Sequence, residues 1–418
     1  MSSGEVPVDL GGVGSETAKH GDPYLYSSKP GGSSMYAEVE RVLASRADWQ
    51  ATSSKSSFDL LIAERWDLPY ARLGRDGFGG SCSGPPMVNH ARGSKAITVK
   101  GLMVKSLRAY CEGHESANIH EFLPETFLLT PGEKSNAFER AALLASATDE
   151  NKVWICKPTG GAHGEGIEIC VGSVEAVKRV DAWLETTAAK KTAPPKTDDT
   201  KFERIPTRPK PPPAWLVQSY IVNPMLIDGR KFDIRAFALV THDNRVFWYR
   251  DFIVRTCSEK FDMSALSNRT AHISNHCVQT TSDNFGAFEE GNEMFAKDLL
   301  RVLEKKGGAE LFVSIETQMR KAVSRTVACA IDQMGGTTDY HAFQVLGFDF
   351  MPDEFGTVWL LEVNGSAAAA KRMTPAISRD VVELAVDRRY PPKKDGAVKN
   401  GAIESGRWTE LDLDTIIA

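Results

Sequence analysis

The alternation of apolar and polar positions divides the chain into helix-like and strand-like stretches. After Ser34, the apolar residues Met35, Val39 and Leu43 recur at helical spacing, which predicts a helix with Ser34 as its N-cap. A continuous apolar run at 58–63 predicts a short buried strand. Further strands are expected at 153–158, 167–171, 216–221, 232–240 and 245–254, and helices after Ser173 and near 289–305, 314–334 and 376–389.

Three stretches lack this patterning. Residues 1–33 are rich in Gly, Ser and Pro, which predicts a flexible leader, and a tail is expected over 393–418. Residues 190–213 hold seven prolines and seven Lys or Arg, a composition that cannot bury a core. We interpret this stretch as an exposed insertion, either a plain linker or a basic strip for an acidic partner.

Composition narrows the class of protein. The chain is 42% hydrophobic and 25% charged, as in ordinary globular proteins, and its net charge of −5 gives no reason to expect nucleic-acid binding. No apolar run is long enough to span a membrane, and the N-terminus lacks an apolar signal region. The seven cysteines form no CxxC pair, which favours free thiols in a reducing, cytoplasmic compartment.

The segment GFDFMPDEFGTVWLLEVNG carries the clearest chemistry. Two strand-like runs flank a polar turn at 353–356, which predicts a β-hairpin. With a four-residue loop, strand alternation places Asp349, Glu362 and Asn364 on one face and Phe348, Phe350, Leu361 and Val363 on the buried face. An odd-numbered loop would break this grouping. Two carboxylates and a carboxamide suit Mg²⁺ with phosphate oxygens, and the alternative is a solvated hairpin face.

Two further segments place charge where phosphate could bind. In KFDIRAFALV, alternation puts Lys231, Asp233 and Arg235 on one strand face, which is either a charged edge or the wall of a phosphate-binding cleft. In VWICKPTGGAHGEGIEI, a strand ends at Lys157 and runs into a Gly-rich turn. This turn is not a Walker A loop, because the lysine precedes the glycines. A simple hairpin turn is the alternative.

The segment HISNHC offers two histidines and a cysteine but no fourth zinc ligand at a usual spacing. We therefore interpret it as a polar loop beside the nucleotide. In YRDFIVRT, Arg250 and Arg255 share no face of a regular strand, so one is expected in a cleft and the other in solvent.

Read in order, these segments resemble the ATP-grasp ligases of the tubulin tyrosine ligase-like family. The motifs that carry the resemblance are VWICKPTGGAHGEG, LVQSY, GRKFDIR, YRDFIVRT, HISNHCVQ, NFGAFEEGNEMF, FQVLGFDFM and VWLLEVNG. The resemblance continues upstream through FDLLIAERWDLPYARLG and VNHARGSKAITVKGLMVKSL, and it covers most of the chain from Ser33 to Pro392.

The resemblance implies an α/β protein with an ATP-grasp fold and an N-terminal Rossmann-like domain. The implied domains are 34–80 (Rossmann-like), 81–222 (central, with the insertion) and 223–392 (C-terminal, with the catalytic residues). ATP and Mg²⁺ are the implied cofactors. The implied catalytic residues are Lys231, Asp233, Arg235 and Arg255, the metal ligands Asp349, Glu362 and Asn364, and the nucleotide-binding residues Lys100, Lys157, Gly161, Gly164, Gly166, Gln218, Tyr220, Ile221, His272 and Asn275.

The activity implied is ATP-dependent addition of free tyrosine to the C-terminal glutamate of detyrosinated α-tubulin, through an acyl phosphate. The implied partner is the α-tubulin tail within the αβ-tubulin dimer, and the enzyme is expected to be a cytoplasmic, cytoskeleton-associated monomer. The fragments EEGNEMF and EVNGSAAAA favour the tyrosine branch. A glutamyl or glycyl ligase of the same family is the first alternative. A non-catalytic tubulin-binding module is the second, although the retained charged residues oppose it.

Three positions depart from the family pattern. Ser219 stands where a lysine is usual in the adenine motif, and Ser274 replaces a threonine. Asp67 stands where a second arginine is expected in a region implied to face tubulin. The change at Ser219 bears on nucleotide contacts and the change at Asp67 on tubulin docking, whereas Ser274 is a conservative replacement.

Overall fold

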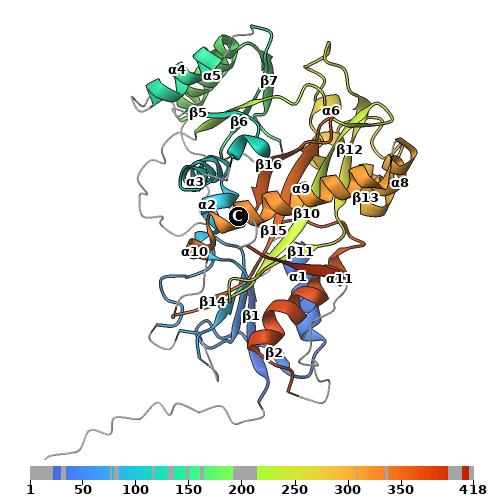
Figure 1. Cartoon of the computed structure of the whole chain (residues 1–418). Helices are drawn as coiled ribbons and strands as arrows, with labels where there is room; N and C mark the ends of the chain where they lie inside the picture. Colours follow the sequence, from blue (N-terminus) through green and yellow to red (C-terminus); the bar gives the residue numbers. More distant parts are fainter. Residues whose placement is uncertain are drawn as a thin grey trace, which may run out of the picture.

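The computed structural model describes most of the chain and shows three β-sheets with helices packed against them (Figure 1). The described residues are 22–29, 34–75, 78–79, 84–114, 118–129, 136–146, 150–160, 164–191, 214–306, 308–334, 338–393 and 407–413. The fold is therefore mixed α/β, as the sequence predicts. No helix among these residues is both long and apolar enough to cross a membrane.

The first sheet has five parallel strands in the order β14-β4-β3-β1-β2. Its strands are β1 (Tyr24–Lys29), β2 (Trp49–Ala51), β3 (Leu60–Ala63), β4 (Met87–Val88) and β14 (His341–Ala342). Helices α1 (Ser34–Ala44) and α11 (Thr374–Val381) share a core cluster with it, to which Val39, Ile62 and Ile377 contribute. The helix predicted after Ser34 is confirmed.

This sheet corrects two expectations about the N-terminal region. The leader predicted over 1–33 is wrong for residues 24–29, because these pair with β2 and β3 in the middle of the sheet. The boundary expected at residue 80 does not coincide with the edge of the sheet, since β4 and the distant β14 both belong to it. Parallel strands need long connections, so chain order alone does not show which segments join such a sheet.

The second sheet is antiparallel, with four strands in the order β5-β8-β6-β7. It comprises β5 (Thr126–Leu129), β6 (Val153–Pro158), β7 (Glu168–Val171) and β8 (Trp215–Ser219). Helices α4 (Asn136–Ser146) and α5 (Ser173–Lys191) cover one face, where Trp154, Cys156 and Val217 are buried. Strand alternation therefore turns Lys157 and Gln218 toward the opposite face. The predicted insertion lies outside the described residues from 192 to 213.

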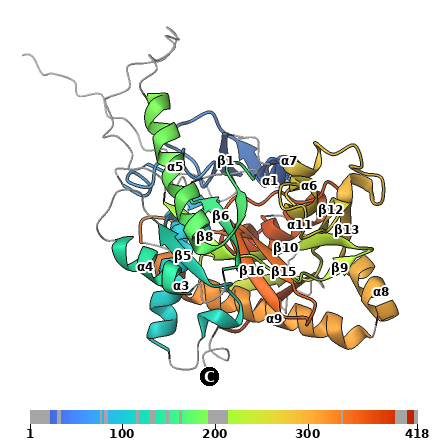
Figure 2. The same ribbon diagram turned by 90° about the horizontal axis from the view of Figure 1, so that it is seen from above.

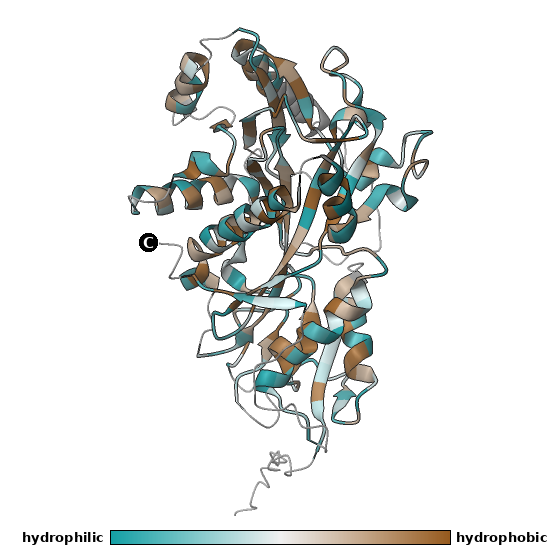
Figure 3. Ribbon diagram, turned by 45° about the vertical axis from the view of Figure 1, so that its right-hand side comes forward, coloured by the Kyte–Doolittle hydropathy of each residue, from teal (hydrophilic) through white to brown (hydrophobic). Residues whose placement is uncertain are grey.

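The third sheet has eight strands and is built around the long central strand β10 (Arg230–Val240). Strand β10 pairs with β9 (Leu226–Ile227), β11 (Val246–Tyr249), β12 (Ile253–Lys260) and β15 (Gln344–Pro352), and the outer strands are β13 (Glu293–Phe295), β16 (Val358–Asn364) and β17 (Trp408–Leu411). Helices α8 (Ala296–Lys306) and α9 (Ala309–Ala328) pack on one face, where Ile234, Phe350 and Met319 share a core. Figure 3 shows hydrophobic residues concentrated along the strands and on one side of the long helices.

Two predictions in this region need correction. The predicted helix 289–305 begins only at Ala296, because the residues before it form β13 at the sheet edge. The tail predicted over 393–418 is wrong for 408–411, which form β17 against β11. Trp408 is buried against Tyr249, and this apolar contact holds the strand in place. The predicted strand 245–254 is two strands, β11 and β12, joined at 250–252.

The remaining helices are short connections, apart from α3, whose inner face lines the core next to β5 and β8. They are α2 (Lys95–Thr98), α3 (Lys100–Glu112), α6 (Arg269–His272), α7 (His276–Gln279), α10 (Ile331–Met334) and α12 (Asp387–Arg389). Seen from above, β6 and β8 overlie β15 and β16 (Figure 2). Lys157 and Gln218 of the second sheet line one cavity together with Asp233 and Asp349 of the third, so the polar faces of the two sheets are turned toward each other.

Candidate active site

A cavity of about 1620 Å³ lies between the second and third sheets. The turn at 64–67 after β3, the first residue of α3 and residues of the segments 272–277 and 366–372 also line it. The predicted site residues that line it are Lys100, Lys157, Gly164, Gln218, Tyr220, Ile221, Lys231, Asp233, Arg235, Arg255, His272, Asn275, Asp349, Glu362 and Asn364. Gly166 does not line it, and Gly161 lies outside the described residues.

The β15–β16 hairpin places Asp349 opposite Glu362, but its loop length and strand register differ from those that the sequence predicts. Pro352 pairs with Val358, so the loop has an odd number of residues, 353–357, instead of four. Strand β16 then has a bulge, because Phe350 faces Leu360 while Asp349 faces Glu362. Leu361 is the extra residue and lines the cavity, so its expected place in the core is wrong.

Asp349 is held between two arginines. Arg235 donates two hydrogen bonds to its carboxylate, one of them at 2.9 Å from Nη2 to Oδ2. Nη2 of Arg255 lies 3.0 Å from the same Oδ2. Burial by itself raises the pKa of an aspartate, but the two guanidinium groups outweigh it and hold the pKa of Asp349 well below its ordinary value. Asp349 is therefore a fixed negative charge at the centre of the cavity.

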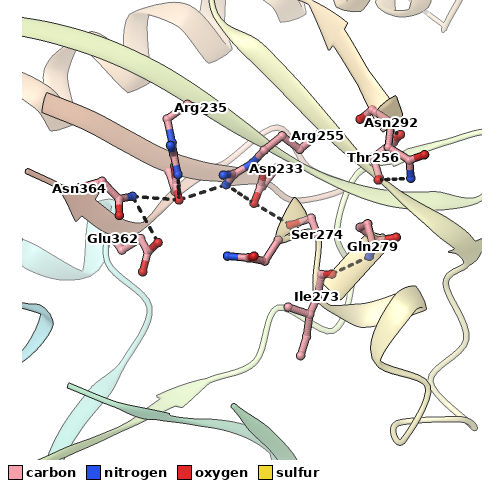
Figure 4. A network of polar contacts seen from close by, with 12 residues as sticks. Asp233, Arg235, Arg255, Thr256, Ile273, Ser274, Gln279, Asn292, Glu362 and Asn364 are labelled. Atoms are coloured by element: carbon pink, nitrogen blue, oxygen red, sulfur yellow. Dashed lines mark hydrogen bonds and ion pairs between the residues drawn. The ribbon is translucent and has the colours of Figure 1, made fainter. Parts of the chain in front are cut away.

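Arg255 also binds Asp233, so one guanidinium connects two carboxylates (Figure 4). Its Nε and Nη2 donate to Oδ1 and Oδ2 of Asp233 at 2.6 and 2.7 Å. Ser274 Oγ donates to Oδ2 of Asp233 at 2.6 Å. The prediction that one of Arg250 and Arg255 enters a cleft is confirmed, because Arg255 lines the cavity whereas Arg250 is exposed at the β11–β12 connection.

Lys231 begins a chain of hydrogen bonds at the cavity wall. Its Nζ donates to Oη of Tyr220 at 2.8 Å, and this Oη lies 2.8 Å from Nδ1 of His272. Nε2 of His272 faces the carbonyl oxygens of Asp262 and Ala265, which places the ring proton on Nε2 and makes Nδ1 the acceptor. Burial lowers the pKa of Lys231 to about 8. The chain orients an ammonium group that is poised to lose its proton.

Lys157 is the matching cation on the opposite sheet. Its Nζ donates to Oε1 of Gln218 at 2.8 Å, and Gln218 is itself held by Thr126 at 2.9 Å. Burial lowers the pKa of Lys157 to about 8, the nearby Glu362 and Asp349 raise it, and Lys100 lowers it. Of the two alternatives for KFDIR, a charged surface edge and the wall of a cleft, the structure shows the second, since Lys231, Asp233 and Arg235 are buried and line this cavity.

Asn364 lies between the two predicted metal-binding carboxylates. Its Nδ2 is 3.3 Å from Oδ2 of Asp349 and 3.3 Å from Oε1 of Glu362. Lys100 Nζ contacts the other oxygen, Oε2, of Glu362 at 2.6 Å. Rotation of the amide by half a turn would point its oxygen into the same space. Among the described residues, no group of three or more His, Cys, Asp or Glu side chains has metal-holding geometry.

Among the cavity residues that sequence reasoning missed are Ile253, Glu293, Phe295 and Arg372. The segment around Glu293 was interpreted as a helix, which hid the strand alternation of Glu293 and Phe295. The spacing of two residues between Glu293 and Phe295 is the sequence signal that would have indicated a strand there. All three departures from the family pattern lie at this site: Ser219 and Asp67 line the cavity, and Ser274 binds Asp233.

Known proteins with similar sequences agree on one family. Residues 83–397 match the model of the tubulin-tyrosine ligase family. The chain is 28% identical to tubulin glycylase 3C of Tetrahymena thermophila over 63% of this chain and 23% of that protein. It is 26% identical to a probable alpha-tubulin polyglutamylase of the same organism, over 79% of this chain and 78% of that protein. It is also 28% identical to a probable tubulin polyglutamylase of Bos taurus, over 67% of this chain and 62% of that protein.

The chain spans less than a quarter of the length of the first of these relatives. The family match covers β4 to α12 and includes the charged site residues described above, which are Lys100, Lys157, Lys231, Asp233, Arg235, Arg255, Asp349 and Glu362. With the match extending over most of its length, the chain belongs to the tubulin-tyrosine ligase family.

Proposed function

We propose that this protein is an ATP- and Mg²⁺-dependent ligase that joins glutamate or glycine to a carboxylate of tubulin. One observation supports it best. Four cations (Lys157, Lys231, Arg235 and Arg255) converge with Asp349 and Glu362 in one cavity. Such an arrangement suits a triphosphate, its metal ion and a carboxylate acceptor at the same time.

The nucleotide would lie across the two facing sheets. Lys100 and Lys157 are placed to contact its phosphates, and Gly164 presents backbone at the same wall. Gln218 and Tyr220 were expected among the nucleotide-binding residues, and their side chains bind Lys157 and Lys231 at the cavity wall. We therefore assign them the role of positioning these lysines. Ile221 is left as the adenine contact at the end of β8.

The residues fit a magnesium ion. Asn364 Nδ2 lies within 3.3 Å of oxygens of both Asp349 and Glu362, and Lys100 contacts the other oxygen of Glu362, so a cation bound to these carboxylates would displace both groups. Two protein carboxylates leave room for phosphate oxygens in the coordination shell. Bound Mg²⁺ would neutralise part of the triphosphate charge.

In the first step, an oxygen of the acceptor carboxylate attacks the γ-phosphorus. An acyl phosphate forms and ADP leaves. Arg235 and Arg255 are placed to hold the acceptor oxygens, and both are fixed in direction by Asp349 and Asp233. In the second step, the amine of the incoming amino acid attacks the acyl carbon, the amide bond forms and inorganic phosphate leaves.

The amino acid is assigned differently from the sequence-based expectation. Tyrosine was expected from EEGNEMF and EVNGSAAAA, but the relatives above are a tubulin glycylase and probable polyglutamylases. A glutamyl or glycyl ligase, the first alternative from the sequence, fits them better. Retention of the charged residues opposes the non-catalytic alternative, since a binding module has no need of four buried or half-buried cations facing a cavity.

The remaining assignments follow from this activity. We propose the cytoplasm and the cytoskeleton as the location, αβ-tubulin as the partner and a monomer as the acting form. The five parallel strands of the first sheet support a Rossmann-like N-terminal domain. Its turn at 64–67 lines the cavity, so this domain would guide the tubulin tail toward the cations.

The test is a parallel incubation with tubulin, Mg·ATP and labelled glutamate, glycine or tyrosine. We expect label from glutamate or glycine in tubulin, and no label when Mg²⁺ is chelated. Incorporation of tyrosine alone would overturn the amino-acid assignment. If none of the three is incorporated, the ligase proposal is wrong and the binding module is favoured.

A further inference from the structure

The hydrogen-bond register of the third sheet places the cavity residues on a regular grid. One row across the strands is Glu293, Arg255 and Asp233, from β13, β12 and β10. The next row, two residues along, is Phe295, Ile253, Arg235, Asp349 and Glu362. Directly opposed residues share a face, and all of these line the cavity. Figure 2 shows the strands side by side, with β13 at the edge farthest from β16.

Charges at the centre of this grid are paired, whereas two at its edge are not. Arg235 binds Asp349, Arg255 binds Asp233, and Lys100 binds Glu362. Within the described part of the chain, the carboxylate of Glu293 forms no ion pair or side-chain hydrogen bond. Arg372 also forms none there, and its guanidinium lies over the ring of Phe295. One carboxylate and one guanidinium therefore face the cavity without a direct ion pair among the described residues, and the opposite charges near them act only at longer range.

We infer that this edge of the cavity, built by Glu293, Phe295 and Arg372, is the subsite for the incoming amino acid. Glu293 binds its α-ammonium group and Arg372 binds its α-carboxylate. This inference rests on the proposed ligase function and names the site of its second substrate. A zwitterion carries both charges a few ångströms apart, and it complements the two unpaired groups.

The surroundings of Glu293 support this assignment. It is half-buried, and its pKa is raised by burial, while His276, Arg255 and Arg372 act in the opposite direction. The cations that face it thus come from α7, from β12 and from the segment before α11. Because Arg255 is its direct neighbour in the sheet, an amine held by Glu293 lies next to the carboxylate-binding arginines. This position suits an amine that must reach the acyl carbon.

The rest of the subsite favours a small or acidic amino acid over an aromatic one. Ala368, Ala369 and Ala370 form the adjoining wall of the cavity. Arg372 covers the ring face of Phe295, so this ring face does not offer stacking to an aromatic side chain. Lys371 also lines the cavity and offers a second positive charge for a side-chain carboxylate.

The chemistry at this subsite balances as follows. The carboxylate of Glu293 accepts one proton from the α-ammonium group, which frees the nitrogen lone pair. The nitrogen attacks the acyl carbon, the C–N bond forms, and the C–O bond to phosphate breaks. Phosphate leaves with the electron pair of that bond and takes up the second proton from nitrogen. No oxidant or further reactant is needed.

The experiment compares Glu293→Gln and Arg372→Gln with two matched controls. Glu290→Gln makes the first change at another residue of the same cavity, and Arg301→Gln makes the second at an exposed arginine of α8 outside the cavity. Each variant is assayed with tubulin and Mg·ATP, first with the amino acid and then with hydroxylamine in its place. Hydroxylamine is a small amine that traps an acyl phosphate as a hydroxamate without needing an amino-acid subsite, so it reports the first step alone.

We expect the KM for the amino acid to rise about tenfold or more in both test variants, with hydroxamate formation kept within about twofold. Glu293→Asp should recover part of the loss. The wild type should prefer the amino acid over its α-carboxamide, and Arg372→Gln should reduce that preference while Arg301→Gln leaves it intact.

The outcomes separate the two proposals. If Glu293→Gln keeps the wild-type KM, or if it loses hydroxamate formation as much as ligation, the subsite is wrong. If the folded wild type forms neither the hydroxamate nor the amide, the ligase function itself is wrong. Thermal unfolding of each variant, including Glu293→Asp, confirms that only folded proteins are compared.

Discussion

Asp349 faces Glu362 across the β15–β16 pair because Leu361 forms a bulge that offsets an odd-numbered hairpin loop. Each irregularity alone would turn the two carboxylates to opposite faces of the sheet. Together they place both in the cavity, within hydrogen-bonding distance of Asn364. The proposed magnesium site therefore depends on a strand bulge as much as on its ligands.

Replacing Glu362 by glutamine should abolish ligation without unfolding the protein. The glutamine keeps the shape but loses the charge that would hold the cation, so we expect activity to fall by more than about a hundredfold, beyond the usual effect of outer-shell changes. The Mg²⁺ concentration needed to bind an ATP analogue should also rise. Glu354→Gln, in the exposed hairpin turn, is the matched control. Retained activity in Glu362→Gln would refute the metal assignment.

Asp349→Asn should destabilise the fold as well as inactivate it. Without this carboxylate, the buried Arg235 loses its ion-pair partner, and removing one member of a buried pair costs about 3–5 kcal/mol. Chemical denaturation measures the loss. Glu410→Gln removes one partner of the exposed Arg245 pair, and its cost should be about 1 kcal/mol or less. Equal losses in the two variants would contradict the central role of Asp349.

Nucleotide affinity should fall as the pH rises above about 8. Burial lowers the pKa of Lys157 and Lys231 from 10.5 to about 8, so the free protein favours their neutral forms above that pH. A bound triphosphate favours the charged forms, so binding then requires proton uptake. The dissociation constant of an ATP analogue should rise by up to about tenfold per pH unit for each lysine.

The same shifts affect folding, because between about pH 8 and pH 10.5 the unfolded chain binds more protons at these two lysines than the folded protein does. Their contribution to the free energy of unfolding therefore rises with pH over this range and falls as the pH is lowered. Lys157→Arg is the informative variant, since arginine keeps its proton over this range and should flatten the affinity profile. Calorimetric titration between pH 7.5 and 9.5 measures both profiles. A wild-type affinity that does not change with pH would show that these lysines do not contact the nucleotide.

Gly347→Ala should disturb catalysis by displacing Arg235. A Cβ at Gly347 would lie 2.6 Å from Cβ of Ala367 and 3.0 Å from Cδ of Arg235, closer than side chains tolerate. We expect about a tenfold or larger loss of activity, because a small misplacement of a positioning group has a large effect on rate. At Gly113 a Cβ would meet nothing closer than 3.6 Å, so Gly113→Ala is the control. Unchanged activity in Gly347→Ala would show that Arg235 has room to move.

Much of the site was predicted from the sequence because strands alternate with a period of two. Lys231, Asp233 and Arg235 share the cavity face of β10, as their spacing requires, and the helix after Ser34 and strand β6 occur where the patterns place them. Glu293 and Arg372 were not found. They lie far apart in the chain, and only the packing of β13 against β12 and of 368–372 against the same cavity places them together.

The sequence by itself determined the local elements, the faces of individual strands and the membership of the family, since these depend on short-range periodicity and on ordered motifs. The tertiary structure alone decided which distant segments complete a sheet, as with β1, β14 and β17, and where a bulge corrects a register. Strand pairing is set by packing between residues hundreds of positions apart, and no local pattern encodes it. Asp349 and Glu362 illustrate this division. The sequence identified them as candidate metal ligands, but only the bulge at Leu361 places them opposite each other on the same face of the sheet.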